Sequence, residues 1–290
     1  DAQPSPSQPR SLSTAHNAVS WRPSIEPRRE PLMPHPTELS ETVVFVEPTA
    51  RRVRATFNGE TVVDSQQAML LFERGHVPHY YFPREDVRFD LLQPTDHSTH
   101  CPHKGDASYW TLRVADRVAQ NAAWAYPDPI QGQQSLSNLV SFYWHEMDHW
   151  YEEDEEVYVH PRDPYRRVDT LLSSRHIEVI LNGQIVADSR RPALLFETGL
   201  PTRYYLPVQD VRLDLLHKSP SVTQCPYKGI ATTWTAEVHG QTFQDIAWSY
   251  PFPIPELPKI ENLICFYNER VDQLLVDGEL EQRPESKFSR

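Results

Sequence analysis

The chain has 290 residues, of which 39% are hydrophobic and 11% aromatic, and its formal net charge is −12. This length is sufficient for two ordinary domains, each with a substantial buried core. The acidic balance, with no stripe of Lys and Arg in the part expected to fold, argues against a protein that tracks nucleic-acid phosphates, because such proteins need a basic surface.

The cysteines and the hydropathy pattern bear on the compartment. The three cysteines, Cys101, Cys225 and Cys265, are an odd number and make no disulfide framework, which favours reduced thiols in the cytosol. No apolar run approaches the roughly 18 residues that span a bilayer, and no charged-then-apolar leader opens the chain. We therefore expect a cytoplasmic protein with neither a membrane nor a nucleic acid as its partner.

Taken in chain order, the sequence begins with a stretch rich in Pro, Ser and Arg that predicts a disordered arm over residues 1–42. The remainder is a repeat: when it is shifted by 124 positions, AWAYPDPI ending at Ile130 falls on AWSYPFPI ending at Ile254, and no gap is needed. A period of this length is a duplicated domain. It predicts a first repeat over 43–156, a linker over 157–168, a second repeat over 169–280 and a tail over 281–290.

Each repeat is typical of a β-rich fold. The stretch RRVRATFNGETVVDS places two alternating runs around Asn58-Gly59, a strong hairpin signal because a type I′ turn needs two positive φ angles. The stretch SYWTLRVADRVAQNAAWAY predicts a second hairpin. Only LSNLVSFYWHEMDHWYE, with apolar residues at helical spacing, predicts a helix. We expect two tandem copies of a small, strongly bent, β-tent-like sheet domain, each with one C-terminal helix.

The strings FERG, YYFPREDV, CPHKGDASYW, AWAYPDP and WYEEDEEV resemble the family catalogued as domain of unknown function 427, and the resemblance covers both repeats. It implies a compact β-rich domain similar to the β-tent folds. The family has also been labelled nucleotidyltransferase-like, but the sequence has no Gly-Ser loop followed by paired aspartates and no phosphate-binding loop pattern. The second repeat departs from the family pattern, with Thr233 at the position of Tyr109. The resemblance thus implies a fold and little chemistry.

Polar and aromatic residues that both repeats keep are candidates for a shared site or for the shared fold. They are Glu73/Glu197, Tyr80/Tyr204, Tyr81/Tyr205, Asp86/Asp210, Arg88/Arg212, Asp90/Asp214, Cys101/Cys225, Lys104/Lys228, Trp110/Trp234 and Asp148/Asp272. Alternation along an expected strand places Arg88 and Asp90 on one face. This favours a structural ion pair over a catalytic one, and leaves Arg88 as a candidate for binding substrate.

The stretch CPHKG admits two interpretations. In the first, Cys101 is a nucleophile whose thiolate is favoured by Lys104, with His100 or His103 as the general base. In the second it is a tight turn, because Pro102 fixes φ and Gly105 permits a left-handed backbone. The second repeat reads CPYKG and loses both histidines. This favours the turn, with Lys104 available to an anionic ligand in either case.

Histidines are concentrated in the first repeat. The stretch HEMDH matches the HExxH pattern of zinc hydrolases, with His145 and His149 as ligands and Glu146 as the base. The second repeat has Glu269 and Gln273 at the ligand positions, which favours a packing helix over a zinc site. We expect no metal. The other histidines of this repeat are either an acid–base or metal site or scattered surface residues.

Two classes of function follow from these residues. The first is a cofactor-independent small-molecule enzyme, of isomerase, cyclase or hydrolase type, with an aromatic pocket in the first repeat. Its catalytic groups would be Glu73, Cys101, His103 and Lys104, and its substrate-binding residues Tyr80, Tyr81, Arg88, Tyr109, Trp110 and Trp124. The alternative is a non-enzymatic small-molecule-binding or protein-interaction module. In either case the internal pseudo-two-fold repeat predicts a monomer.

Overall fold

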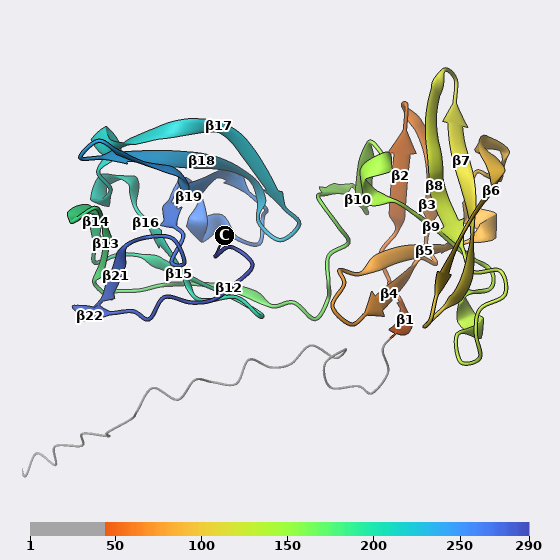
Figure 1. The fold of residues 1–290 in the computed structure, drawn as a ribbon, viewed down its shortest axis with the longest axis horizontal. Coiled ribbons are helices and arrows are strands. Elements are labelled where there is room, and N and C mark those ends of the chain that lie inside the picture. The colour runs from red at the N-terminus through yellow and green to blue at the C-terminus, as the bar shows by residue number, and fades with distance from the viewer. Residues whose placement is uncertain (1–43, 290) are drawn as a thin grey trace, which may run out of the picture. The chain divides into compact units, whose positions relative to one another are not determined.

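The computed structural model describes residues 44–289 (Figure 1). The disordered arm expected over residues 1–42 lies outside this range. The described part is mainly β, as expected from the sequence, and each repeat contributes eleven strands in two antiparallel sheets. The two repeats use the same strand order, so each strand of the second repeat has a counterpart in the first.

The first repeat consists of a seven-stranded and a four-stranded sheet. The order in the larger sheet is β1-β4-β5-β9-β8-β7-β6, and in the smaller one it is β11-β10-β2-β3. The strands are β1 (Val44–Pro48), β2 (Val53–Phe57), β3 (Glu60–Ser65), β4 (Met69–Glu73), β5 (His79–Pro83), β6 (Leu92–Cys101), β7 (Gly105–Val114), β8 (Arg117–Ala125), β9 (Leu139–Phe142), β10 (His149–Glu152) and β11 (Glu155–Val157).

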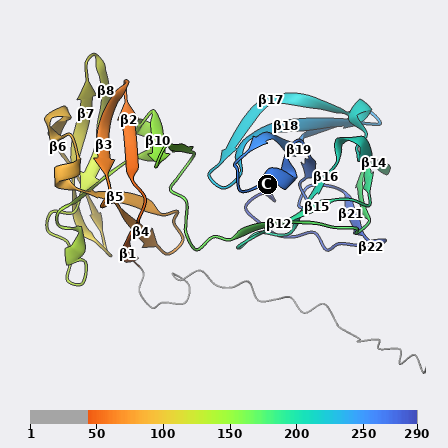
Figure 2. The same cartoon turned by 180° about the vertical axis from the view of Figure 1, so that it is seen from behind.

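The second repeat has the matching sheets, β12-β15-β16-β20-β19-β18-β17 and β14-β13-β21-β22. Figure 2 shows the strands β17, β18 and β19 curving together across one side of this repeat. The strands are β12 (Val168–Leu172), β13 (Ile177–Leu181), β14 (Gln184–Ser189), β15 (Ala193–Glu197), β16 (Arg203–Leu206), β17 (Leu216–Cys225), β18 (Gly229–Val238), β19 (Gln241–Pro253), β20 (Ile264–Phe266), β21 (Gln273–Val276) and β22 (Glu279–Leu280).

Both hairpins expected from the sequence are confirmed. Strands β2 and β3 pair around Asn58 and Gly59, whose φ angles are 50° and 78°, as a type I′ turn requires. The second repeat has the same turn at Asn182 and Gly183, with φ angles of 45° and 73°. Strands β7 and β8 form the second hairpin.

The prediction of a C-terminal helix in each repeat is wrong. The helical segments of the described residues are three-residue 3₁₀ turns, and none is long and apolar enough to cross a membrane. All four residues of β9 are buried. A strand covered on both faces reads as a continuous apolar run, which periodicity alone does not distinguish from a buried helix. The stretch that suggested a helix contains η3 (Gln134–Leu136), β9, η4 (Trp144–Glu146) and β10.

Each seven-stranded sheet carries hydrophobic clusters on both faces, although its edge strand, β6 or β17, is mostly exposed. Between the two sheets of the first repeat lies the inter-sheet core, which includes Phe57, Phe82 and Trp150. The opposite face of the larger sheet carries a second cluster, which we call the outer cluster; in the first repeat it includes Tyr81, Tyr109, Trp124, Tyr126 and Leu136. The second repeat has the matching outer cluster around Tyr205, Trp248 and Tyr250. The candidate site lies at this outer cluster.

Candidate functional site

The turn over residues 101–105 sets the position of Lys104. The backbone N–H of Lys104 donates to the carbonyl of Cys101 at 3.2 Å, and Gly105 has a φ of 106°. A Cβ at Gly105 would lie 3.3 Å from the carbonyl oxygen of Asp128 and 3.3 Å from the amide nitrogen of Ile130, so both the φ angle and the space require glycine. The expected left-handed turn is therefore confirmed, and it brings the lysine into the outer cluster.

Lys104 forms a buried ion pair. It is 6% exposed, its Nζ donates to the carboxylate of Glu73 at the end of β4, and it lies 5.8 Å from the ring centroid of Tyr126. Lys228 is 8% exposed and makes the same pair with Glu197. A buried ammonium is costly unless it is paired. The kept lysine and glutamate are thus one unit, placed at the same position in each repeat.

The aromatic side chains beside this pair are arranged alike in the two repeats. The indole Nε1–H of Trp124 donates to the hydroxyl of Tyr81 at 3.0 Å, and its ring lies 4.5 Å from that of Tyr143. In the second repeat, Trp248 donates to Tyr205 at 3.0 Å, and its ring lies 4.4 Å from that of Tyr267. The two repeats, which keep these Trp and Tyr residues at the same positions, therefore keep one geometry for them.

Tyr109 belongs to the first repeat alone. Its hydroxyl lies 2.8 Å from that of Thr99. Burial, and then the hydrogen bond with Tyr109, raise the pKa of Tyr143 to about 12, so this phenol stays protonated at neutral pH. In the second repeat Thr233 replaces Tyr109, and its hydroxyl donates to the carbonyl of Ser221 at 2.7 Å.

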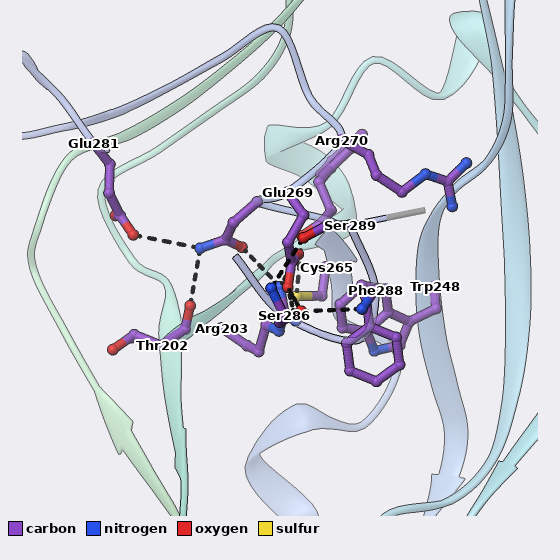
Figure 3. A network of polar contacts seen from close by, with 12 residues as sticks. Thr202, Arg203, Trp248, Cys265, Glu269, Arg270, Glu281, Ser286, Phe288 and Ser289 are labelled. Carbon is purple, nitrogen blue, oxygen red and sulfur yellow. Dashed lines mark hydrogen bonds and ion pairs between the residues drawn. The ribbon is translucent and has the colours of Figure 1, made fainter. Parts of the chain in front are cut away.

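The main difference between the repeats lies where β5 meets β9, and β16 meets β20. In the second repeat Arg203 makes two hydrogen bonds of 2.7 Å to Glu269, and the side chains are 4% and 0% exposed (Figure 3). The first repeat has His79 and His145 at these positions. Burial, and then the charge of Lys104, lower the pKa of His79 to about 4, so this imidazole is neutral at pH 7.

A cleft opens at the outer cluster of the second repeat. Arg166, from the linker, donates to Glu197 at 3.3 Å and to the carbonyl of Thr198 at 2.9 Å. The linker and the second repeat contribute the cations Arg166, Arg203, Lys228 and Lys287 and the carboxylates Asp163, Glu197 and, paired with Arg203, Glu269, which leaves an excess of one positive charge. Its lining includes Arg166, Glu197, Arg203, Cys225, Tyr227, Lys228, Trp248, Tyr250 and Tyr267.

The structure brings part of the predicted site together. Glu73, Lys104, Tyr81, Tyr109 and Trp124 meet at the outer face, with Cys101 half-buried against them. Neighbouring residues of a strand point to opposite faces, and this separates the remaining aromatic residues from the site.

Tyr80 and Trp110 pack toward the inter-sheet core. The hydroxyl of Tyr80 donates to Glu152, and the ring of Trp110 lies 5.9 Å from that of Phe89. Because Tyr80 and Tyr81 are adjacent on one strand, only one of them can face a given site.

Arg88 and His103 are exposed and lie apart from the outer cluster. Arg88 makes two hydrogen bonds to Asp90, of 2.8 and 2.6 Å. Asp90 lies in the 3₁₀ turn η2 (Phe89–Leu91), not in the expected strand. His103 lies at the surface of the turn that places Lys104.

Sequence reasoning missed Tyr126, Tyr143 and His79 as site residues. The repeated strings AWAYP/AWSYP and FY carry the first two, because Tyr126 falls on Tyr250 and Tyr143 on Tyr267. His79 has no such signal, since its counterpart is an arginine and only the fold shows that both lie beside a buried Lys–Glu pair.

The geometric premise of the HExxH interpretation does not hold, because His145 lies in η4 and His149 on β10, with no helix to place them on one face. His149 lies 2.7 Å from Glu156 on the paired strand β11. Over the described residues, the His, Cys, Asp and Glu side chains whose ligand atoms converge are His176, Glu178 and Asp188.

This second-repeat group occupies an ion-pair position. His176 lies 2.7 Å from Asp188, and at the matching positions of the first repeat Arg52 lies 2.7 Å from Asp64. In both copies a nitrogen side chain contacts a carboxylate at this place, and that pairing accounts for the group without a metal ion.

Comparison with known protein families identifies the family of both repeats. Residues 45–153 and 169–277 each match the model of the family described as Domain of unknown function (DUF427). The chain belongs to this family. Each match falls on one of the two repeats, so the protein is a tandem DUF427 protein, which confirms the resemblance read from its motifs. A search of curated proteins found no match.

Proposed function

We propose that the repeats of this tandem DUF427 protein bind small organic anions with a planar apolar body. The observation that carries the proposal is the buried Lys–Glu pair beside an aromatic wall in both repeats. We use Trp–Tyr wall for these aromatic residues, which are Tyr81, Trp124, Tyr126 and Tyr143 in the first repeat and Tyr205, Trp248, Tyr250 and Tyr267 in the second. The ammonium would meet the carboxylate of the ligand, and the aromatic rings would cover its apolar part.

The charge and the chemistry of the wall support an anion over a cation or a neutral lipid. The cations of the linker and the second repeat, Arg166, Arg203, Lys228 and Lys287, outnumber by one the carboxylates of Asp163, Glu197 and Glu269. The tyrosine hydroxyls are donors toward a ligand oxygen. Burial raises the pKa of Tyr250 well above its usual value, so this hydroxyl keeps its proton.

The proposal is tested with 2-naphthoate, a small aromatic carboxylate, by calorimetric titration of the full chain. We expect saturable binding that falls roughly tenfold when both lysines are replaced in the double variant Lys104→Gln/Lys228→Gln. A second variant that also carries Glu73→Gln and Glu197→Gln avoids leaving a buried carboxylate unpaired. Lys259→Gln, at an exposed lysine bonded to the carbonyl of Thr170, is the matched control. Unchanged affinity in the lysine variants contradicts the proposal.

A second candidate function is proton-transfer catalysis in the first repeat, and one observation favours it. His79 stays neutral beside Lys104 and Glu73, whereas its counterpart is an arginine held by Glu269. A carboxylate base next to a neutral imidazole that polarises a carbonyl is a combination found in isomerases. Glu73 would take the proton from a carbon next to a carbonyl, and His79 with Lys104 would stabilise the enolate oxygen, with no organic cofactor.

The catalytic candidate is tested by proton–deuterium exchange into a panel of small keto acids, followed by NMR. We expect His79→Gln to abolish any exchange that the chain catalyses, while Lys259→Gln leaves it unchanged. Exchange that is equal in wild type and His79→Gln contradicts it, and does not affect the binding proposal.

A further inference from the structure

The C-terminal tail, residues 281–289, returns to the site of the second repeat after β22. The hydroxyl of Ser286 donates to the carboxylate of Glu269. The ring of Phe288 lies 5.8 Å from that of Tyr267, and the guanidinium of Arg203 lies 5.6 Å from the Phe288 centroid. Figure 3 shows Ser286 and Phe288 beside the Arg203–Glu269 pair. The tail thus contacts the polar centre and the aromatic wall together.

The tail is anchored and shaped by its own hydrogen bonds. Arg283 donates to the carbonyl of Val271 at 2.7 Å, which fixes the start of the segment. The amide of Phe288 donates to the hydroxyl of Ser286 at 3.1 Å, and the amide of Ser289 donates to the carbonyl of Ser286 at 3.1 Å. These bonds form a tight turn that presents the Phe288 ring to the cleft, whose lining includes it.

The first repeat shows what the same site looks like without such a segment. Tyr143 is 36% exposed, and the side chain of His145 is 76% exposed. Their counterparts are half-buried Tyr267 and fully buried Glu269. The residues that match 286–288 of the tail are 162–164, which read Arg-Asp-Pro and carry neither a hydroxyl nor an aromatic ring.

We propose that residues 284–289 are an intramolecular ligand of the second repeat, with Phe288 as the aromatic anchor and Ser286 as the polar contact. The occupant is a segment of this chain, because it supplies an aromatic side chain to an aromatic wall and a hydroxyl to a buried carboxylate. A small molecule then shares the cleft with the Phe288 ring and reaches Glu269 only by displacing Ser286, while His145, the counterpart of Glu269, stays exposed. This last consequence rests on the proposed function; the occupancy by the tail does not.

The occupancy is tested by supplying the tail in trans. A labelled peptide of residues 284–289 is titrated by fluorescence anisotropy into the full chain and into a chain that ends at Arg283. We expect the peptide to bind the shortened chain roughly tenfold more tightly than the full chain, and a peptide carrying Phe288→Ala to lose most of this affinity. Equal binding to the two chains, no binding, or equal binding by the two peptides overturns the proposal.

A second measurement uses the full chain and does not depend on the shortened one. Trypsin cleavage after Lys287 needs an undocked tail, so we expect Phe288→Ala to accelerate this cut roughly tenfold over wild type. The control is Phe252→Ala, at a ring that is 86% exposed on β19. Equal cleavage rates in wild type and Phe288→Ala overturn the proposal. Loss of 2-naphthoate binding alone would refute the proposed function and leave these results intact.

Discussion

The two repeats share a framework and differ at its polar centre. Both keep the same strand order, the same lysine turn and the same Trp–Tyr hydrogen bond. Where β5 and β9 meet, the first repeat has His79, and His145 follows β9. At the matching place in the second repeat, Arg203 and Glu269 form a buried ion pair.

This difference shows which residues the duplication left free to change. The turn and the Lys–Glu pair are held by backbone geometry and by the cost of a buried charge. The neighbouring pair has only to be mutually compatible, so it has become a neutral imidazole with an exposed histidine in one copy and a salt bridge in the other. Differences in function between the copies are therefore to be sought there.

The largest effect is expected from breaking the ion pair of the second repeat. Arg203→Ala leaves Glu269 buried without its cation, which should lower the free energy of unfolding of this repeat by about 4 kcal/mol. Chemical unfolding followed by CD measures it. The double variant Arg203→His/Glu269→His installs the side chains of the first repeat and should cost less. If Arg203→Ala lowers the free energy of unfolding no more than His79→Ala does, the ion pair of the second repeat and His79 of the first do not differ in their contribution to stability.

The next effect concerns pH and belongs to the first repeat. The folded-state pKa of His79 is about 4, below the ordinary value of 6.5. Between pH 4 and pH 6.5 the unfolded chain therefore binds a proton at this imidazole that the folded chain does not. The stability contributed by the neutral imidazole is complete above pH 6.5 and is lost as the pH falls toward 4, by up to about 3 kcal/mol. The difference in thermal midpoint between wild type and His79→Gln should therefore change over this window. A difference that is constant from pH 7 to pH 4 contradicts the assignment.

The smallest effect tests what the repeats have in common. Gly105→Ala and Gly229→Ala introduce a Cβ at a positive φ, 3.2–3.3 Å from a backbone oxygen, and should each cost about 2 kcal/mol. Gly59→Ala is the control, because Gly59 has a φ of 78° but nothing within 4 Å of the added Cβ, so only the backbone cost of about 1 kcal/mol applies. Urea unfolding compares the three. Equal costs at Gly59 and Gly105 would mean that the turn tolerates a side chain.

Much of the fold could be predicted because it depends on local or repeated signals. Asn58-Gly59 specifies its hairpin through two positive φ angles, and Gly105 specifies its turn in the same way. The expected helix failed because β9 is buried on both faces and therefore lacks the alternation that marks a strand. The grouping of Tyr80 with Tyr81 failed for a simpler reason, since adjacent strand residues cannot share a face.

The sequence by itself determined that this protein is a duplicated β-rich domain and that a lysine and a glutamate are kept in both copies. Only the tertiary structure decided that Lys104 meets Glu73, that Arg203 meets Glu269, and that Phe288 reaches Tyr267. These contacts join residues that are far apart in the chain, and they depend on the sheet order that places β5 beside β9 and β16 beside β20. Local conformational preference specifies a turn, but long-range pairing is decided by which strands become neighbours.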